Sequence, residues 1–405
     1  MQSNRFSFGW RALLAIFSVA LFVASSSAVT EHVLHGFSTG KGGANPYAGL
    51  IFDKSGNLYG TALLGGTHDY GAVFELTPKS GGGWTEKILH NFEGADGYYP
   101  QAGVIMDASG NLYGTTVAGG AHGVGTVYEL LPTGGRWTEK VVHSFTDNGK
   151  DGYQPYAGLT FDAAGNLYGT TYFGGTHGYG TVFELSPKTG RWTETILYSF
   201  KGDGKDGYDV YSGIVFDKSG NLYGTTYGGG AYGYGTVYEL SSKAGGDWTE
   251  KVLHSFNDNG TDGYNPYAGL IIDASGNLYG TTLWGTAAGN SAGTVFEMSP
   301  EKGGGWSESI LNTFVDTDGW APYGGLIFDS AGNLYGTTTY GGVDNGGTVF
   351  ELTLKEGQWT KQVLYSFDGY TGPYGGLILD RAGNLYGTTF QSWTYEYGTV
   401  FEFTP

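Results

Sequence analysis

The chain has 405 residues, of which 76 are glycine, 32 tyrosine, 23 phenylalanine and 10 tryptophan, while only 14% are charged. This composition favours strands and turns over long helices, and the absence of cysteine excludes stabilisation by disulfides. The formal net charge of −18 opposes binding to phosphate backbones and anionic membrane surfaces, so no nucleic-acid partner is expected.

The N-terminal residues have the pattern of a secretory signal peptide. Arg5 and Arg11 precede an apolar run over residues 12–24, which is followed by the small residues SSSA that end at Ala28. The run is shorter than the roughly 20 apolar residues that a membrane span requires. We therefore predict that residues 1–28 are removed on export. Residues 29–405 are then a secreted, periplasmic or cell-surface protein without stable membrane insertion.

A heptapeptide, GNLYGTT, recurs through the rest of the chain, with a near copy, GNLYGTA, at Gly56. The exact copies begin at Gly110, Gly165, Gly220, Gly276, Gly332 and Gly383. Each unit of about 55 residues contains four short strand patterns, which in the third unit cover 156–162, 166–171, 180–185 and 192–200. Seven such antiparallel units predict an all-β fold, a seven-bladed β-propeller that forms a single domain over 29–405.

The two ends of the repeat region are complementary. TEHVLHGF from Thr30 matches the fourth strand of a unit, whereas GTVFEF from Gly398 matches a third strand and lacks a fourth. We expect the N-terminal strand to complete the last blade, because this closes the ring and removes exposed sheet edges. The alternative is an open solenoid, for which distinct capping repeats would be expected.

The combination of WTExVLHSF, DGxxPYAGLxxDxxGNLYGTT and GTVFEL in each unit resembles the GloVer tandem repeat family of bacterial exported proteins, the choice-of-anchor proteins. The resemblance covers essentially all of 30–405 and implies an exported or surface-associated protein of undefined biochemical activity. No sorting signal follows Phe403, so free secretion or periplasmic residence is expected as much as surface attachment. The stretch GLxxDxxGNLY is also similar to the blade motif of NHL and sugar-lactone propellers, which supports the architecture.

Two loop families, between blades and between the second and third strands of a blade, should share one face of the ring. Both are rich in aromatic and acidic residues, which suit the C–H faces and the hydroxyls of sugars. This face is therefore predicted to bind saccharide, and the alternative is that its aromatic side chains pack between blades. The candidates are Tyr153, Tyr208 and Tyr264 in regular loops, and Trp284, Trp320, Tyr370, Trp393 and Tyr395 where the repeat is irregular.

The loops DNGKDG and DNGTDG suggest a calcium site, because hard cations bind several oxygen ligands. The candidate ligands are Asp147, Asp151, Asp258 and Asp262. Asx turns are the alternative, since the spacing differs from that of an EF-hand. Strand histidines such as His143 and His254 have no second ligand at hairpin or helix spacing and are interpreted as packing residues. The glutamates of the GTVFEL strands are expected to pair across the sheet with Lys or Thr.

The sequence contains no nucleophile elbow, phosphate loop or nucleotide fingerprint, so no catalytic residue is assigned and no cofactor beyond calcium is considered. The leading hypothesis is a monomeric binding or scaffold module for carbohydrate or another cell-surface component. One alternative is a propeller enzyme of the lyase or lactonase type with a metal at the central mouth. Another is a purely structural envelope protein.

Overall fold

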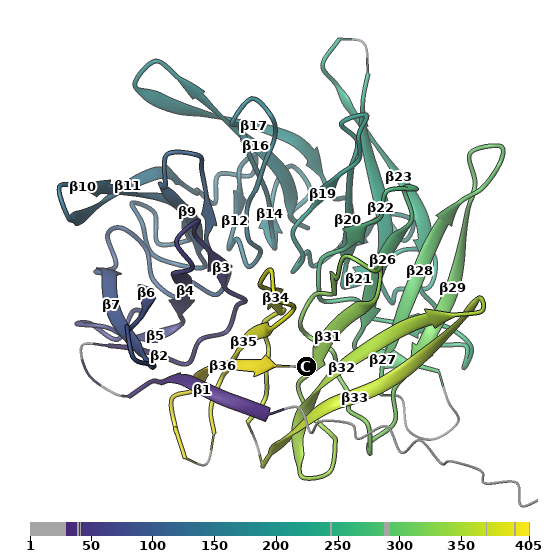
Figure 1. Cartoon of the computed structure of the whole chain (residues 1–405). Helices are drawn as coiled ribbons and strands as arrows, with labels where there is room; N and C mark the ends of the chain where they lie inside the picture. The colour runs from purple at the N-terminus through teal and green to yellow at the C-terminus, as the bar shows by residue number, and fades with distance from the viewer. Residues whose placement is uncertain are drawn as a thin grey trace, which may run out of the picture.

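The structure, a computed structural model, describes residues 30–38, 40, 42–243, 245–286, 292–369, 371–392 and 394–404. Seven four-stranded antiparallel sheets surround a central axis, which confirms the predicted seven-bladed propeller (Figure 1). Within the described residues no helix has the length and hydropathy needed to cross a membrane. The predicted signal peptide, residues 1–28, lies outside them.

The blades are numbered 1 to 7 in the order of their innermost strands. These strands are β3 (Ile51–Phe52), β8 (Ile105–Met106), β13 (Thr160–Phe161), β19 (Val215–Phe216), β25 (Ile271–Ile272), β30 (Ile327–Phe328) and β34 (Ile378–Leu379). The second strands carry the LYGTT motif and are β4 (Leu58–Ala62), β9 (Leu112–Thr116), β14 (Leu167–Thr171), β20 (Leu222–Thr226), β26 (Leu278–Thr282), β31 (Leu334–Thr338) and β35 (Leu385–Thr389).

The outer half of each blade is a longer hairpin. The third strands are β6 (Ala72–Pro78), β10 (Thr126–Thr133), β16 (Thr181–Lys188), β22 (Thr236–Ser242), β28 (Thr294–Pro300), β32 (Asn345–Lys355) and β36 (Thr399–Thr404). The outermost strands are β7 (Trp84–Asn91), β11 (Arg136–Ser144), β17 (Arg191–Ser199), β23 (Trp248–Ser255), β29 (Trp306–Thr313), β33 (Gln358–Asp368) and, for blade 7, β1 (Thr30–Gly36).

The N-terminal strand closes the ring, as the sequence predicts. In blade 7, β1 pairs antiparallel with β36, from Thr30 opposite Thr404 to Gly36 opposite Thr399. The backbone N–H of Phe37 then donates to the carbonyl of Gly398 at 2.9 Å. The first and last strands of the repeat region therefore form one sheet.

The core lies between neighbouring blades, and the repeated motif supplies it. In blade 2, Leu112 is fully buried and Tyr113 is 5% exposed. Tyr113 packs with the side chains of blade 3, and its hydroxyl donates to Glu129 at 2.7 Å. The Thr115 hydroxyl crosses to blade 3 and donates to the carbonyl of Ala157 at 3.0 Å. Leu112, Tyr113 and Thr115 of LYGTT thus have packing roles, as expected for a motif present in every blade.

The turn DxxGN between the first two strands is stabilised by its aspartate. In blade 2, Asp107 Oδ1 accepts the backbone N–H of Ser109 at 2.8 Å and of Asn111 at 2.9 Å, and Oδ2 accepts the Asn111 side-chain amide at 2.8 Å. Gly110 has a φ of 86°, which L residues rarely adopt. Asp and Gly therefore fix the turn together, as predicted from the sequence.

The glutamates of the third strands pair as expected. Glu129 lies opposite Lys140 in the β10–β11 register, with 3.9 Å between Oε2 and Nζ. Glu75 pairs with Lys87 in the same way in blade 1.

Candidate functional site

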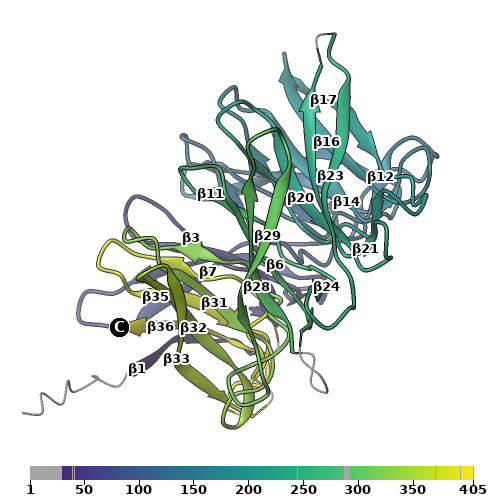
Figure 2. The same ribbon diagram turned by 90° about the vertical axis from the view of Figure 1, so that its right-hand side faces the viewer.

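The two predicted loop families meet on one face of the ring, called the loop face here. Between-blade and within-blade loops pair as short sheets: β2 (Gly43–Ala44) with β5 (Leu64–Gly65), β12 (Gly152–Tyr153) with β15 (Phe173–Gly174), β18 (Gly207–Tyr208) with β21 (Gly228–Gly229) and β24 (Gly263–Tyr264) with β27 (Trp284–Gly285). Figure 2 shows β12, β21 and β24 along the same side of the ring. The blades thus hold both loop families in fixed positions.

Aromatic side chains follow one another across the loop face of blades 4 to 6. Tyr264 contacts Tyr234 with ring centroids 5.2 Å apart, and in the β24–β27 register it lies opposite Trp284. Trp284 stacks on Trp320 at 5.9 Å, and Trp320 stacks on Tyr340 at 4.4 Å. All five side chains are half-buried. Part of each side chain therefore packs between loops, and part is accessible to a ligand. We call these five residues the aromatic row.

The other predicted aromatic candidates are placed separately. Tyr153 pairs with Phe173 at 5.6 Å and Tyr208 with Tyr179 at 5.9 Å, in loops of blades 3 and 4. Tyr395 is 37% exposed and lines a different pocket, together with Glu31 and Tyr365. Tyr370 and Trp393 lie outside the described residues.

The central channel is narrowed by tyrosines that the sequence analysis did not single out. In six blades the segment before the innermost strand has the form Tyr-X-Gly, with Ala, Ser or Gly at X, and places its tyrosine near the axis, and Gln101 takes this position in blade 2. The tyrosines are Tyr47, Tyr156, Tyr211, Tyr267, Tyr323 and Tyr374. The Tyr47 and Tyr267 hydroxyls meet at 3.3 Å, and Gln101 donates to Tyr267 at 3.2 Å. Burial raises the pKa of both tyrosines, so both stay neutral.

The lining of the central channel is relevant to the alternative of a metal-dependent enzyme with its metal at the central mouth. The axial cavity has a volume of about 210 Å³, and its described lining contains only Tyr, Ala, Gly and Ser. This described lining contains neither a carboxylate nor an imidazole, and Asp209 lies outside it, beside Tyr172, which packs on the axial Tyr156 and Tyr211. The signal in the sequence was the Tyr-X-Gly segment that precedes each innermost strand except that of blade 2, and its tyrosines converge only once the ring is closed.

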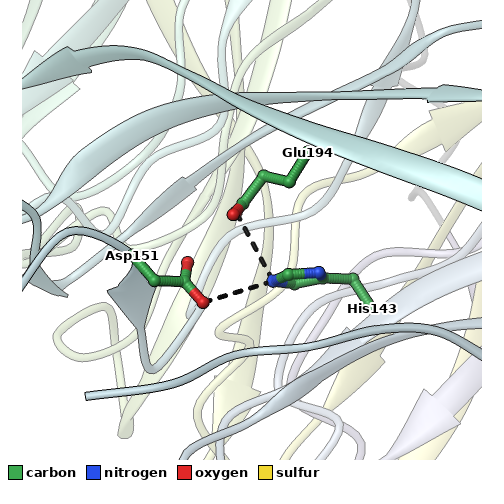
Figure 3. Close-up of side chains that lie close together, drawn as sticks. All are labelled: His143, Asp151 and Glu194. Atoms are coloured by element: carbon green, nitrogen blue, oxygen red, sulfur yellow. Dashed lines mark ion pairs between the residues drawn. The ribbon is translucent and has the colours of Figure 1, made fainter. Parts of the chain in front are cut away.

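Two clusters of titratable side chains lie between blades near the rim, and we call them the junction triads. The first combines His143 on β11, Asp151 in the loop after it and Glu194 on β17 of the next blade. His143 Nε2 lies 3.4 Å from Asp151 and 3.5 Å from Glu194, and both carboxylates face this one nitrogen (Figure 3). The loop positions Asp151, whose Oδ2 accepts the Thr146 N–H at 2.9 Å.

The second triad repeats this geometry between blades 4 and 5. His254 Nε2 lies 3.1 Å from Asp262 and 3.5 Å from Glu308. Asp262 Oδ2 accepts the N–H of Asn257 at 3.0 Å, just as Asp151 accepts that of Thr146. The two triads are therefore copies of one structural unit, two blades apart.

Burial dominates the electrostatics of the triads. It raises the pKa of Glu194 and of Glu308 to about 7 each, although the neighbouring histidine opposes the shift. Burial alone would lower the pKa of His143 and of His254, but the facing carboxylates raise it above the ordinary histidine value. Each site therefore gathers negative charge that needs a proton or a cation to balance it.

The structure places the four predicted calcium ligands in two different environments. Asp151 and Asp262 are each 7% exposed and belong to the triads, whereas Asp147 and Asp258 are exposed and belong to neither. Between them, Asn148 and Asn259 accept backbone N–H groups of their own loops, which are the Asx turns weighed as the alternative. Sequence spacing gave no second ligand for the histidines because one ligand follows in a loop and the other comes from the next blade.

The repeat profile described as the Gloeobacter/Verrucomicrobia repeat matches residues 17–215 and 193–401. No curated protein sequence matches the chain. Among solved structures, a fungal alcohol oxidase in complex with copper gives a TM-score of 0.55 at 14% identity, with 93% of this chain and 76% of that chain covered.

Two bacterial structures are also similar. The extracellular domain of a protein described as a one-component system of B. thetaiotaomicron gives a TM-score of 0.53 at 15% identity over 89% of this chain, which spans 39% of that chain's length. A protein described as a 6-phosphogluconolactonase from Bacteroides uniformis gives 0.51 at 13% identity, with 89% of this chain and 100% of that chain covered. At these identities the similarity concerns the fold alone.

Proposed function

The chain belongs to the Gloeobacter/Verrucomicrobia repeat family, and from this premise we propose that it is an exported binding module whose loop face holds carbohydrate. The signal-peptide pattern of residues 1–28 supports export. The repeat itself supplies the rigid scaffold, because the residues common to all blades are used in packing.

The aromatic row is the observation that carries this proposal. Five aromatic side chains line up over three neighbouring blades, held by paired loops rather than by free ones. An aromatic side chain with an apolar face and a polar edge is complementary to a sugar ring, which has an apolar C–H face and polar hydroxyl groups. The hydroxyls of Tyr340 and Tyr374 meet at 3.0 Å and tie the row to the axial tyrosines.

The first test is binding of the purified protein to a panel of polysaccharides and glycans, by glycan array and then by isothermal titration calorimetry. For a glycan that binds, we expect Trp284→Ala and Trp320→Ala to weaken the affinity about tenfold or more, since truncated aromatic anchors dominate binding sites. Melting temperatures of both variants separate a binding defect from a folding defect.

Val343→Ala is the matched control, because Val343 is 83% exposed in the within-blade loop of blade 6. This variant should bind like the wild type. A panel without saturable binding would overturn the carbohydrate proposal. Binding that survives both tryptophan substitutions would move the site away from the aromatic row.

A further inference from the structure

We propose that each junction triad is a binding site for one divalent transition-metal ion of the zinc class, which joins two neighbouring blades. The ligands would be His143, Asp151 and Glu194 in the first site and His254, Asp262 and Glu308 in the second. The proposal concerns the rim of the ring and is independent of carbohydrate binding on the loop face.

The spacing of the ligand atoms fits such an ion. His143 Nε2 is 3.4 and 3.5 Å from its two carboxylates, and all three ligand atoms lie within 4.8 Å of one another. Two ligands bound to tetrahedral zinc at about 2.0–2.1 Å would be roughly 3.3 Å apart. One imidazole and two carboxylates are a ligand set that zinc accepts, whereas calcium requires six to eight oxygens.

Buried atoms without partners are the second, independent observation. Asp151 and Asp262 are more than nine-tenths buried, and Oδ1 of each has no hydrogen-bond partner among the described residues. Within the same part of the chain, Oε1 of Glu194 and of Glu308 also has no partner, but Oε1 of Glu139 at the junction of blades 1 and 2 shares this property, so the aspartate oxygens are the distinguishing feature. A buried polar atom left without a partner is destabilising, so the free Oδ1 of Asp151 and of Asp262 indicates a ligand.

A comparison within the ring shows what makes these two junctions special. At the junction of blades 1 and 2, His90 lies 2.8 Å from Asp96, but the other oxygen of Asp96 accepts the N–H of Glu93 at 2.8 Å. Both carboxylate oxygens are used there, because the loop is two residues shorter. The free oxygen thus accompanies the loop DNGxDG of these two junctions, whereas in the equally long loop between blades 3 and 4 Asp206 Oδ1 accepts the N–H of Gly207 at 2.7 Å.

The junction of blades 5 and 6 contains a cation of its own. Lys361 takes the position of Glu194 and Glu308, and its ammonium lies 2.5 Å from Asp318, the equivalent of Asp151. The positive charge of the lysine and the negative charge of the aspartate balance each other at this junction. A triad with two carboxylates and a neutral imidazole would be balanced by two positive charges, which is the charge of a divalent ion.

The test is a calorimetric titration of chelator-treated, purified protein with Zn²⁺. We expect two equivalents to bind, one to remain in His143→Ala or His254→Ala, and none in the double variant. Because the alanine variants remove buried rings, Glu194→Gln and Glu308→Gln, which keep the side-chain volume, should likewise each remove one equivalent. Zinc should raise the melting temperature of the wild type but not that of the double variant, since a ligand of the folded state stabilises it.

A matched control sharpens the result. His90→Ala should leave two equivalents, because His90 belongs to neither triad.

Several outcomes would overturn the proposal. The wild type could bind fewer than two equivalents of zinc, or the double variant could still bind two. The His90→Ala variant could also lose as many equivalents of zinc as His143→Ala does. Equal binding of Ca²⁺ or Mg²⁺ would overturn the assignment to the zinc class. A triad that is balanced by a proton alone would show no zinc-dependent rise in melting temperature.

Discussion

At the scale of single residues, buried carboxylates at the blade junctions link stability to pH. Glu139 and Glu250 occupy the Trp-Thr-Glu position of blades 2 and 4 and belong to neither triad. Burial raises the pKa of each to about 7. Near neutral pH these groups are therefore partly protonated in the folded protein, whereas in the unfolded chain they are ionised.

This shift predicts a loss of stability as the pH rises. A carboxyl group whose folded pKa lies above its ordinary value of 4.5 binds more protons in the folded state, so its contribution is present below about pH 4.5 and is lost as the pH rises through about 7. We expect Glu139→Gln and Glu250→Gln each to remove part of this loss, on the order of 1 kcal/mol after allowance for solvent screening. Denaturant unfolding at about pH 5 and about pH 8 measures the difference.

The charges of His90 and Asp96 act on Glu139, the first lowering and the second raising its pKa, so the comparison with the wild type is the informative quantity. Glu301→Gln, at an exposed position, is the control and should leave the pH profile unchanged. A difference between the two pH values that is identical in the wild type and both glutamine variants would contradict the assignment.

At the scale of the element, the DxxGN turn should contribute through its aspartate. Asp107→Ala removes the acceptor of three hydrogen bonds at the β8–β9 turn. We expect a loss of about 2 kcal/mol in the free energy of unfolding, because the two backbone N–H groups lose their intramolecular partner. Chemical denaturation measures it. Asp147→Ala, in an exposed loop, should change stability by less than about 0.5 kcal/mol, and equal losses in the two variants would contradict the role of the turn.

The strands and turns could be predicted because their signals are local and repeated. The turn residues Asp107 and Gly110 follow rules that act within five residues of sequence, and the repeat confirms them in each blade. The junction triads could not be predicted in this way. Glu194 joins His143 only through the packing of one blade on the next, and no rule of spacing along the chain describes that contact.

The loop face, which is predicted to bind saccharide, could be predicted from the sequence only in part. The two loop families could be assigned to one face from the sequence, since strand alternation decides on which side a loop emerges. The continuation of Tyr264, Trp284 and Trp320 into one row with Tyr234 and Tyr340 could not. That row depends on ring stacking between loops of different blades.

At the scale of the whole molecule, stability depends on closing the ring. Blade 7 is built from both ends of the repeat region, and Tyr365 on β33 of blade 6 donates to Glu31 on β1 at 2.6 Å. Without β1, the edge of β36 would be unpaired and the side chains of blade 6 would lose part of their cover. Because every blade packs on two neighbours, a defect at one junction affects the complete ring.

Deletion of residues 30–37 should therefore lower the melting temperature strongly and broaden the transition, as scanning calorimetry would show. The informative control keeps the same residues in another order. Since Thr30 lies opposite Thr404, a short turn can join residue 404 to residue 30, and the permuted chain would begin at residue 42. Blade 7 would then have the hairpin connection of the other blades, so the permuted protein should regain the melting temperature of the wild type. If the deletion melts like the wild type, or the permuted chain like the deletion, the ring does not depend on β1 as a closing strand.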